Sequence, residues 1–342
     1  METLGKRGPS TTVVGLLALL VVLAVLALAA CGGTSTTAST SPSAAPSPAA
    51  AVTASPSPSW SPTMSPAAIP VVKPGQKPPS FSKLKALYAY DTSEPLGFEE
   101  DYPLSVAGVP LRQITFTSGG HKAKALLVVP EGEGPFPVVV YAPGWMTPAI
   151  SNSEYAATFA KKGYAGLLIE EPNTAFYTFD APTDIAAFVR YATQGRRALD
   201  LLQTMPEIDA QRIGFFGWSN GAFLGSLLAG LEDRIKAYVF LGAPGTTTFT
   251  AEEKKSMGVP TGAKFARWAA QVSVIDNVAY VGRNKGAQML FINGKDDPNA
   301  MHAAKALLAA APKGATWHVY AGGHGSTPSA DQYWQAWLLK NL

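Results

Sequence analysis

The sequence is poor in cysteine and histidine, and this scarcity limits the chemistry available to it. Cys31 is the only cysteine, so no internal disulfide can form and no cysteine is left for a metal site elsewhere. The four histidines are not paired at the spacing of metal ligands. No glycine-rich phosphate loop stands in a suitable context. We therefore expect neither a metal nor a cofactor.

Charged residues are also few. They make up 15% of the chain, and the formal net charge is only +3. The basic residues form no block and do not alternate with aromatic residues, as they do in many nucleic-acid-binding proteins. We expect no nucleic-acid partner. Hydrophobic residues reach 47%, which is enough for a sizeable core.

Residues 1–30 have the layout of an export signal. Lys6 and Arg7 precede an uncharged apolar run from Val13 to Ala30. The run ends in Leu28-Ala29-Ala30-Cys31, which resembles the lipobox of bacterial lipoproteins. That resemblance implies cleavage before Cys31, its lipidation, and attachment to the outer face of a bacterial cell membrane. The alternative is a retained transmembrane anchor, because the run is nearly long enough to span a bilayer.

Residues 31–80 consist almost wholly of Ser, Thr, Pro and Ala. Such a segment cannot bury enough apolar surface to offset the entropy lost on ordering. We expect a disordered tether whose prolines keep it extended. Residues 81–342 then form one catalytic domain.

Short apolar runs alternate with helical patterns after residue 81, which is typical of an α/β sheet protein. Two of the runs flank Ser118-Gly119-Gly120 and predict an antiparallel hairpin. A long helix is expected to be capped at its start by Thr183 or Asp184, and Pro206 marks its end. The eight expected strands are Leu111–Phe116, Lys124–Val129, Val138–Tyr141, Tyr164–Ile169, Ile213–Phe216, Ala237–Leu241, Gln288–Ile292 and Thr316–Tyr320.

The candidate nucleophile is Ser219. It lies in Gly217-Trp218-Ser219-Asn220-Gly221, a G-x-S-x-G pattern. In this pattern the serine occupies a sharp, strained turn between a strand and a helix, and the glycines remove side chains that would clash. The residues before the pattern predict a buried strand, and those after it predict a helix with small residues. That context indicates a nucleophile.

These residues, with Asp209 to Ile213 before them, resemble the α/β-hydrolase superfamily, and within it the dienelactone-hydrolase-like and acetyl-esterase-like serine hydrolases. The run from Pro137 to Trp145 is similar to the third strand and oxyanion loop of that group. Gly217-Trp218-Ser219 and Pro143-Gly144 also resemble bacterial cutinase-type polyester hydrolases. The resemblance implies a mostly parallel, eight-stranded sheet with helices on both faces and no large lid. True dienelactone hydrolases carry a cysteine nucleophile, so Ser219 makes that particular activity less expected.

A serine nucleophile needs a histidine base that is oriented by a carboxylate. His324 is the candidate base, because it lies in a glycine-rich loop after the last expected strand. The acid should follow the strand Gln288–Ile292, where Asp296 and Asp297 are both available. The family pattern favours Asp297 and leaves Asp296 to cap the next helix or face water.

The resemblance assigns the oxyanion hole to two backbone N–H groups, those of Trp145 and Asn220. Aromatic side chains near Ser219 are candidates for the walls of a substrate pocket. They are Trp145, Trp218, Phe176 and Tyr177.

The resulting hypothesis is a serine hydrolase that cleaves small or polymeric carboxylic esters through an acyl-enzyme intermediate. Two alternatives remain open. One is a serine peptidase or acyltransferase on the same fold, and the other is a surface lipoprotein that uses the fold only for binding.

Overall fold

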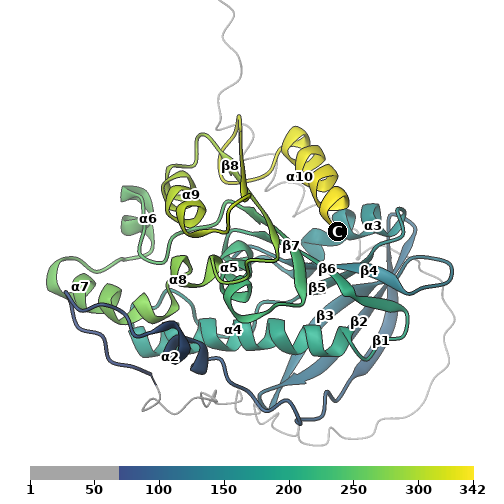
Figure 1. Cartoon of the computed structure of the whole chain (residues 1–342), viewed down its shortest axis with the longest axis horizontal. Helices are drawn as coiled ribbons and strands as arrows, with labels where there is room; N and C mark the ends of the chain where they lie inside the picture. Colours follow the sequence, from purple (N-terminus) through teal and green to yellow (C-terminus); the bar gives the residue numbers. More distant parts are fainter. Residues whose placement is uncertain (1–68) are drawn as a thin grey trace, which may run out of the picture. The chain divides into compact units, whose positions relative to one another are not determined.

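The computed structural model describes residues 69–342, except for the side chains of residues 102 and 103 (Figure 1). The predicted export signal, the lipidation of Cys31 and the tether up to residue 68 lie outside the described residues. Within the described part of the chain, no helix is long and apolar enough to cross a membrane.

The sheet has nine strands in the order β1-β2-β3-β5-β4-β6-β7-β8-β9. Neighbours from β1 to β5 pair antiparallel, and those from β5 to β9 pair parallel. The strands are β1 (Glu99–Val106), β2 (Val109–Ser118), β3 (His121–Val128), β4 (Phe136–Ala142), β5 (Ala165–Ile169), β6 (Ile208–Trp218), β7 (Ile235–Leu241), β8 (Gln288–Gly294) and β9 (Thr316–Tyr320).

The prediction of eight strands is therefore wrong by one, because the sequence analysis missed β1. This strand lies at the edge of the sheet and pairs only with β2. Its register shifts between Glu100 and Pro103. An edge strand has one side open to water, so β1 does not need the apolar pattern by which a buried strand is recognised.

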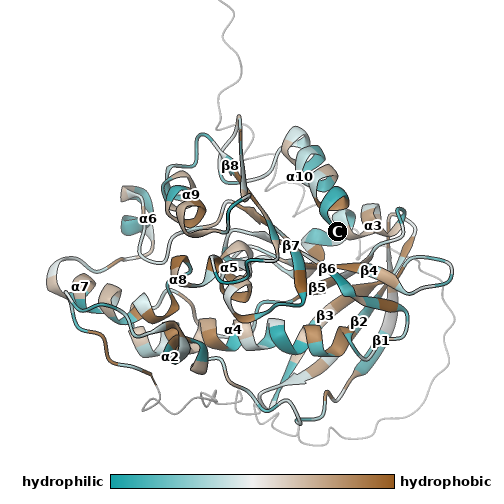
Figure 2. Cartoon of the chain, viewed as in Figure 1, coloured by the Kyte–Doolittle hydropathy of each residue, from teal (hydrophilic) through white to brown (hydrophobic). Residues whose placement is uncertain are grey.

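Helices cover both faces of the sheet (Figure 1). They are α2 (Phe81–Ala86), α3 (Ser153–Ala160), α4 (Ala181–Leu202), α5 (Asn220–Leu231), α6 (Ala251–Ser256), α7 (Gly262–Val272), α8 (Val278–Val281), α9 (Pro298–Ala310) and α10 (Pro328–Asn341), with the 3-10 turns η2 (Ala149–Asn152) and η3 (Ser273–Ile275). Successive strand residues face opposite sides of the sheet, and the parallel strands carry runs of consecutive buried residues, so both faces are apolar there. Much of these strands is brown in Figure 2, with teal segments among the brown.

Each face has its own core. Val138 and Val140 of β4 pack in the cluster that includes α4 and α5, whereas Val139 and Tyr141 pack in the cluster with α3 and α10. In the second cluster the ring of Trp334 stacks on that of Phe216, with centroids 4.2 Å apart. The sheet is therefore packed against helices on both faces.

The ordered domain begins before the predicted boundary at residue 81. Val72 is buried, and its backbone N–H donates to Gln271 Oε1 of α7 at 3.0 Å. Gln271 Nε2 in turn donates to the carbonyl of Pro70 at 2.7 Å. The segment 69–80, which composition assigned to the tether, thus packs on the domain because the Gln271 side chain binds its backbone and Val72 joins the hydrophobic core.

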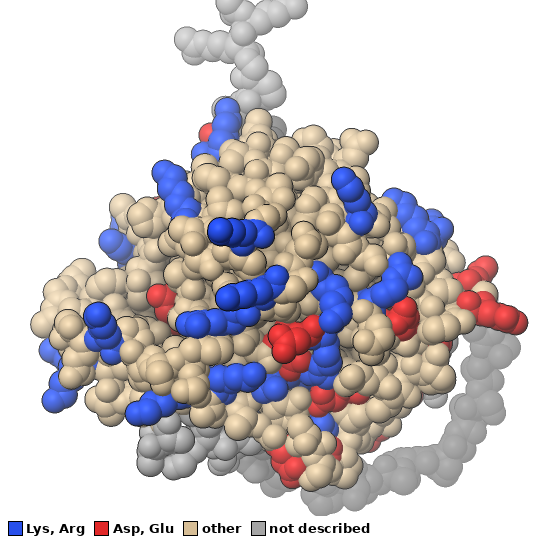
Figure 3. All heavy atoms as spheres, in the orientation of Figure 1, with Lys and Arg blue, Asp and Glu red and all other residues tan. Residues whose placement is uncertain are grey.

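On the face seen in Figure 3, Lys and Arg side chains are spread over the surface, and Asp and Glu lie among them mainly in the lower half and at the right edge. This distribution agrees with the small net charge of +3.

Candidate active site

Ser219 occupies the turn between β6 and α5. Its backbone has φ 53° and ψ −115°, a strained conformation for a residue with a side chain. The N–H of Ser219 donates to the carbonyl of Leu241 at 2.9 Å, which ties the turn to the end of β7. This strand–turn–helix geometry presents the hydroxyl at the edge of the sheet, as the G-x-S-x-G pattern predicts.

The two glycines of the pattern are required by close backbone contacts. A Cβ atom on Gly217 would lie 2.4 Å from the carbonyl oxygen of Gly221. A Cβ atom on Gly221 would lie 2.1 Å from the carbonyl oxygen of Ala142. Both distances are far below any tolerated contact, so only glycine lets α5 begin this close to β4 and β6.

The structure brings Ser219, His324 and Asp297 together from three separate loops. Ser219 Oγ lies 2.8 Å from His324 Nε2, and His324 Nδ1 lies 2.6 Å from Asp297 Oδ2. An ionised carboxylate can only accept hydrogen bonds, so the proton on this side of the ring belongs to Nδ1. The lone pair of Nε2 is then free to accept the proton of the serine hydroxyl, which is what activates such a nucleophile.

Asp297 is fixed by a second hydrogen bond. It is the N-cap of α9, and its Oδ1 accepts from the backbone N–H of Ala300 at 3.0 Å. Burial raises the pKa of the Asp297 carboxyl, but the hydrogen bonds from His324 and Ala300 outweigh this and leave the pKa below its usual value. Asp296 is exposed and does not cap the helix, so the cap and the contact to His324 belong to the same residue.

The loop that carries His324 is braced from two sides. Trp218 Nε1 donates to the carbonyl of His324 at 2.9 Å. The hydroxyl of Tyr320 donates to the carbonyl of Gly325 at 2.7 Å. The imidazole itself remains about half exposed, with a side-chain exposure of 46%, so a substrate can reach it.

Trp145 and Asn220, whose backbone N–H groups are the expected oxyanion donors, line the same cavity as Ser219. Trp145 is in the loop after β4, and Asn220 is the first residue of α5. Within the described part of the chain neither N–H takes part in a hydrogen bond. The next N–H along, that of Met146, donates instead to Glu171 Oε2 at 3.3 Å. Two unoccupied donors beside a serine hydroxyl can stabilise an oxyanion.

A cavity of about 100 Å³ opens beside Ser219 and His324. Trp145 and Tyr177 line it, and their rings meet edge to face with centroids 5.2 Å apart. The remaining lining residues are Asn220, Pro244, Gly245, Thr248, Phe249, Glu253, Met257 and Asn299.

Two of the predicted pocket residues lie elsewhere. Phe176 is buried in the core and packs on Phe188, with ring centroids 4.9 Å apart. Trp218 lines a neighbouring cavity of about 220 Å³ and holds the His324 loop through its indole N–H. Nearness to the nucleophile in the sequence does not decide which cavity a side chain lines, since Trp218 directly precedes Ser219 and yet lines the second cavity.

The sequence analysis missed the wall contributed by residues 244–257. This segment follows β7, whose carboxyl end lies at the same edge of the sheet as Ser219. A local signal was present, because Thr250 and Glu253 form a capping box that starts α6. The signal marks a helix start, but nothing in it indicates that the helix lines a cavity.

The loop that carries Tyr177 is held by a buried carboxylate. Asp184 Oδ1 accepts from the N–H of Thr178 at 2.7 Å, and Oδ2 accepts from Trp268 Nε1 at 2.8 Å and from the N–H of Phe179. Burial raises the pKa of Asp184, although these donors oppose the shift. The expected cap of α4 at Thr183 or Asp184 is therefore wrong. Asp180 is the N-cap, and Asp184 faces inward to order the loop.

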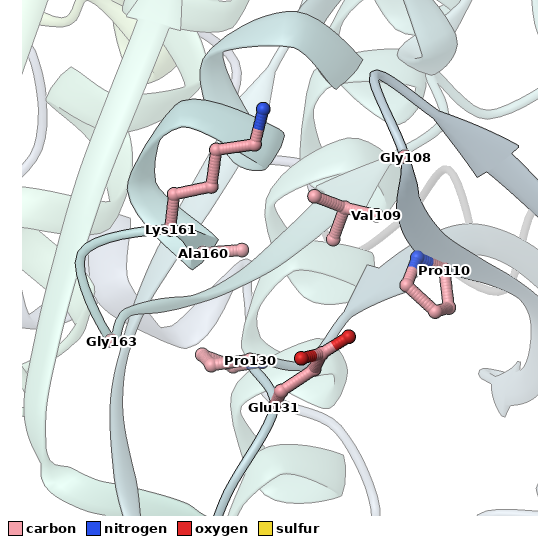
Figure 4. A pocket seen from close by; sticks show the side chains of 8 residues that line it. All are labelled: Gly108, Val109, Pro110, Pro130, Glu131, Ala160, Lys161 and Gly163. Atoms are coloured by element: carbon pink, nitrogen blue, oxygen red, sulfur yellow. The ribbon is translucent and has the colours of Figure 1, made fainter.

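No group of three or more His, Cys, Asp or Glu residues in the described range could hold a metal ion. A further cavity of about 390 Å³ lies between the β1–β2 turn, the segment after β3 and the end of α3 (Figure 4). It is at the opposite end of the parallel strands from Ser219, since Gly163 in its wall precedes β5. It shares no residue with the candidate active site.

A family model described as "Esterase FrsA-like" matches residues 99–262. The matched curated proteins include "Esterase FrsA" of Enterobacter sp. strain 638, which is 31% identical over 153 residues, covering 44% of this chain and 36% of that protein. "Esterase FrsA" of Escherichia coli O157:H7 is 33% identical over 153 residues, which again cover 44% of this chain and 36% of that protein. The match thus spans about a third of the length of these relatives.

Among solved structures, an acetyl xylan esterase from Paenibacillus sp. R4 superposes with a TM-score of 0.63 at 17% identity, covering 79% of this chain and 98% of that one. Acetyl xylan esterase 1 from Thermoanaerobacterium sp. JW/SL YS485 gives a TM-score of 0.62 at 16% identity, with coverage of 77% and 94%. Identities this low establish the fold alone. The chain has the α/β-hydrolase fold, and the fold predicted from the sequence is confirmed.

Proposed function

We propose that the chain is a serine hydrolase that cleaves carboxylic esters, with Ser219 as nucleophile, His324 as general base and Asp297 as the residue that orients the base. The observation that carries this proposal is the line of two hydrogen bonds from Ser219 Oγ to Asp297 Oδ2 at a strained strand–helix turn. The likeness to proteins named as esterases supports ester hydrolysis over other acyl-transfer reactions of this fold.

The reaction would proceed in two acyl-transfer steps. His324 Nε2 takes the proton of Ser219 as Oγ attacks the ester carbonyl, and the negative charge goes to the carbonyl oxygen. The N–H groups of Trp145 and Asn220 would bind that oxygen, at the positive end of α5. His324 then gives the proton to the departing alcohol. Water attacks the acyl-serine with His324 as base again, which releases the acid and restores the hydroxyl.

The size of the cavity favours a short acyl group. Its volume of about 100 Å³ is smaller than the roughly 150 Å³ of an apolar protein cavity that holds one benzene molecule. Phe249 and Met257 form part of its wall. Acetyl and propionyl groups fit such a space, whereas longer chains need it to widen.

A panel of p-nitrophenyl esters tests both the activity and the chain length. We expect kcat/KM for acetate and propionate to exceed that for octanoate by roughly tenfold or more. The Met257→Ala variant should raise the relative rate on octanoate, because it removes part of the cavity wall. Met301→Ala on α9 is the matched control, since Met301 is not among the cavity-lining residues.

Peptide p-nitroanilides in the same panel separate esterase from peptidase. Turnover of the anilides alone would reject ester hydrolysis as the function. A preference for octanoate in the wild type, or an equal effect of Met257→Ala on every chain length, would reject the short acyl group.

We also propose that the protein is exported and lipid-anchored through Cys31. The support is the order of a basic start, an apolar run and the sequence Leu28-Ala29-Ala30-Cys31. In a bacterial host we expect labelled palmitate to enter the wild type and not the Cys31→Ser variant. Equal labelling of both would reject lipidation, and an unlabelled protein of full length in the membrane fraction would favour the transmembrane anchor.

A further inference from the structure

Glu171 lies where the ends of three parallel strands meet. It follows β5, and β4 stands between β5 and β6 in the sheet. These strands run parallel, so their carboxyl ends share one edge. From there Glu171 can reach both the loop after β4 and the turn after β6.

Its carboxylate joins these two segments. Glu171 Oε1 accepts a hydrogen bond from Asn220 Nδ2, and Oε2 accepts one from the backbone N–H of Met146 at 3.3 Å. Met146 directly follows Trp145, and Asn220 directly follows Ser219. One side chain therefore connects the two backbone stretches whose N–H groups would form the oxyanion hole.

A third residue fixes the direction of the Asn220 amide. The hydroxyl of Tyr177 donates to Asn220 Oδ1 at 3.1 Å, opposite the bond from Nδ2 to Glu171. Asn220 is only 1% exposed, so water cannot replace either partner. With a donor on one end and an acceptor on the other, the amide has a single satisfied orientation.

The same contacts reach three strained residues. Met146, Tyr177 and Ser219 have φ angles of 58°, 56° and 53°, which non-glycine residues rarely adopt. Each such conformation costs about 1–3 kcal/mol and persists only where its surroundings hold it in place. Glu171 binds the backbone of Met146 directly, and it binds Tyr177 and the Ser219 turn through Asn220.

We propose that Glu171 is a positioning residue that sets the separation of the two oxyanion donors, the N–H groups of Trp145 and Asn220. The inference rests on the proposed function and deepens it. A donor displaced by as little as 1 Å loses most of its effect on the transition state, whereas binding of the neutral ester depends on it less. Loss of Glu171 should therefore lower kcat and leave KM nearly unchanged.

The ionisation of Glu171 supports this role. Burial raises the pKa of its carboxyl, the hydrogen bonds from Asn220 and Met146 oppose the shift, and the charge of Glu170 adds to it. In the pH range between the ordinary pKa and the raised one, the folded state holds a proton that the unfolded state has lost. Stability therefore falls as pH rises through that range. A carboxyl group that stays buried although burial disfavours its charge is typical of a functional position.

The test compares Glu171→Ala, Glu171→Gln and Glu94→Ala with short p-nitrophenyl esters and with a phenylboronic acid, which mimics the tetrahedral intermediate. Glu94 is the matched control, because its carboxylate also accepts two backbone N–H groups, those of Gly119 and Gly120, at the β2–β3 turn outside the cavity. We expect Glu171→Ala to lower kcat by roughly 10- to 100-fold with KM within about threefold. Boronate affinity should fall by a similar factor.

Glu171→Gln retains one acceptor and the shape of the side chain, so its kcat should lie between those of the wild type and Glu171→Ala. It also serves if the alanine variant does not fold. Glu94→Ala should keep the wild-type kcat. The proposal is overturned if kcat of Glu171→Ala and Glu171→Gln stays within twofold of the wild type, if only KM changes, or if Glu94→Ala loses as much kcat. If instead Ser219→Ala retains turnover, the proposed function itself fails.

Discussion

Replacing Ser219 by alanine is expected to lower kcat for short p-nitrophenyl esters by about 10⁴- to 10⁶-fold. The reason is that Ser219 Oγ lies 2.8 Å from His324 Nε2, which takes the hydroxyl proton as Oγ attacks the ester. Without the hydroxyl no acyl-enzyme can form, and only the oxyanion donors and binding remain to assist water. The fold should persist, because alanine meets the same backbone strain as serine.

Labelling with a fluorophosphonate gives an independent measurement, since the probe reacts only with an activated serine. The matched control is Ser226→Ala, which removes a fully buried hydroxyl from α5, the helix that follows Ser219, and loses one hydrogen bond to the carbonyl of Ala222. The wild type and Ser226→Ala should both be labelled, and Ser219→Ala should not. Persistent labelling or turnover in Ser219→Ala would show that the nucleophile is another residue. A wild type with neither labelling nor turnover would favour the binding lipoprotein.

The second large effect is expected for Asp297→Asn, which should lower kcat by about 10⁴-fold. The amide oxygen can still accept from the N–H of Ala300 and cap α9, where Asn and Asp are about equally good. Its NH₂ group then faces His324 Nδ1 and favours the tautomer whose Nε2 carries the proton. That tautomer cannot accept the proton of Ser219.

Asp296→Asn is the matched control, because Asp296 precedes Asp297 directly and is exposed. It should leave kcat unchanged, and a loss equal to that of Asp297→Asn would contradict the assignment. Unfolding in urea at neutral pH separates an effect on catalysis from one on stability. The free energy of unfolding should change by only about 0.5 kcal/mol for Asp297→Asn, because asparagine retains the helix cap.

The pH dependence of that difference has a definite sign. The folded-state pKa of Asp297 lies below its ordinary value of 3.8, mainly because hydrogen bonds from His324 and Ala300 overcome the effect of burial. The carboxylate therefore stabilises the fold fully above that value, and the stabilisation is lost as pH falls through the lowered pKa. Asp297→Asn should lack this acid-range loss in urea unfolding measured below pH 4.

The local part of the site could be predicted from the sequence. Gly217 and Gly221 flank Ser219 at this spacing because the backbone around the turn comes too close to both positions to leave room for a side chain. His324 and Asp297 could be selected because few other histidines and carboxylates follow a strand end in the required order. These inferences needed only chain order and the rule that parallel strands share one carboxyl edge.

The remaining features depended on packing between distant segments. Phe176 was expected in the pocket and lies in the core, because the bend near Tyr177 determines which aromatic ring turns inward. Glu171 gave no signal at all, since its partners Met146 and Asn220 are 25 and 49 residues away. The edge strand β1 was missed because its partly solvent-facing residues carry no strong periodicity.

The sequence by itself determined the α/β-hydrolase fold, the strained turn at Ser219 and the identity of the residues that meet there. Those features arise from short-range steric contacts and from hydrophobic periodicity, and both depend on residues that are close together in the sequence. Only the tertiary structure decided the size of the cavity, the second role of Asp297 as a helix cap and the link that Glu171 makes between two loops. Side-chain directions at loop ends depend on what packs behind them, and that is fixed only when the whole sheet is assembled.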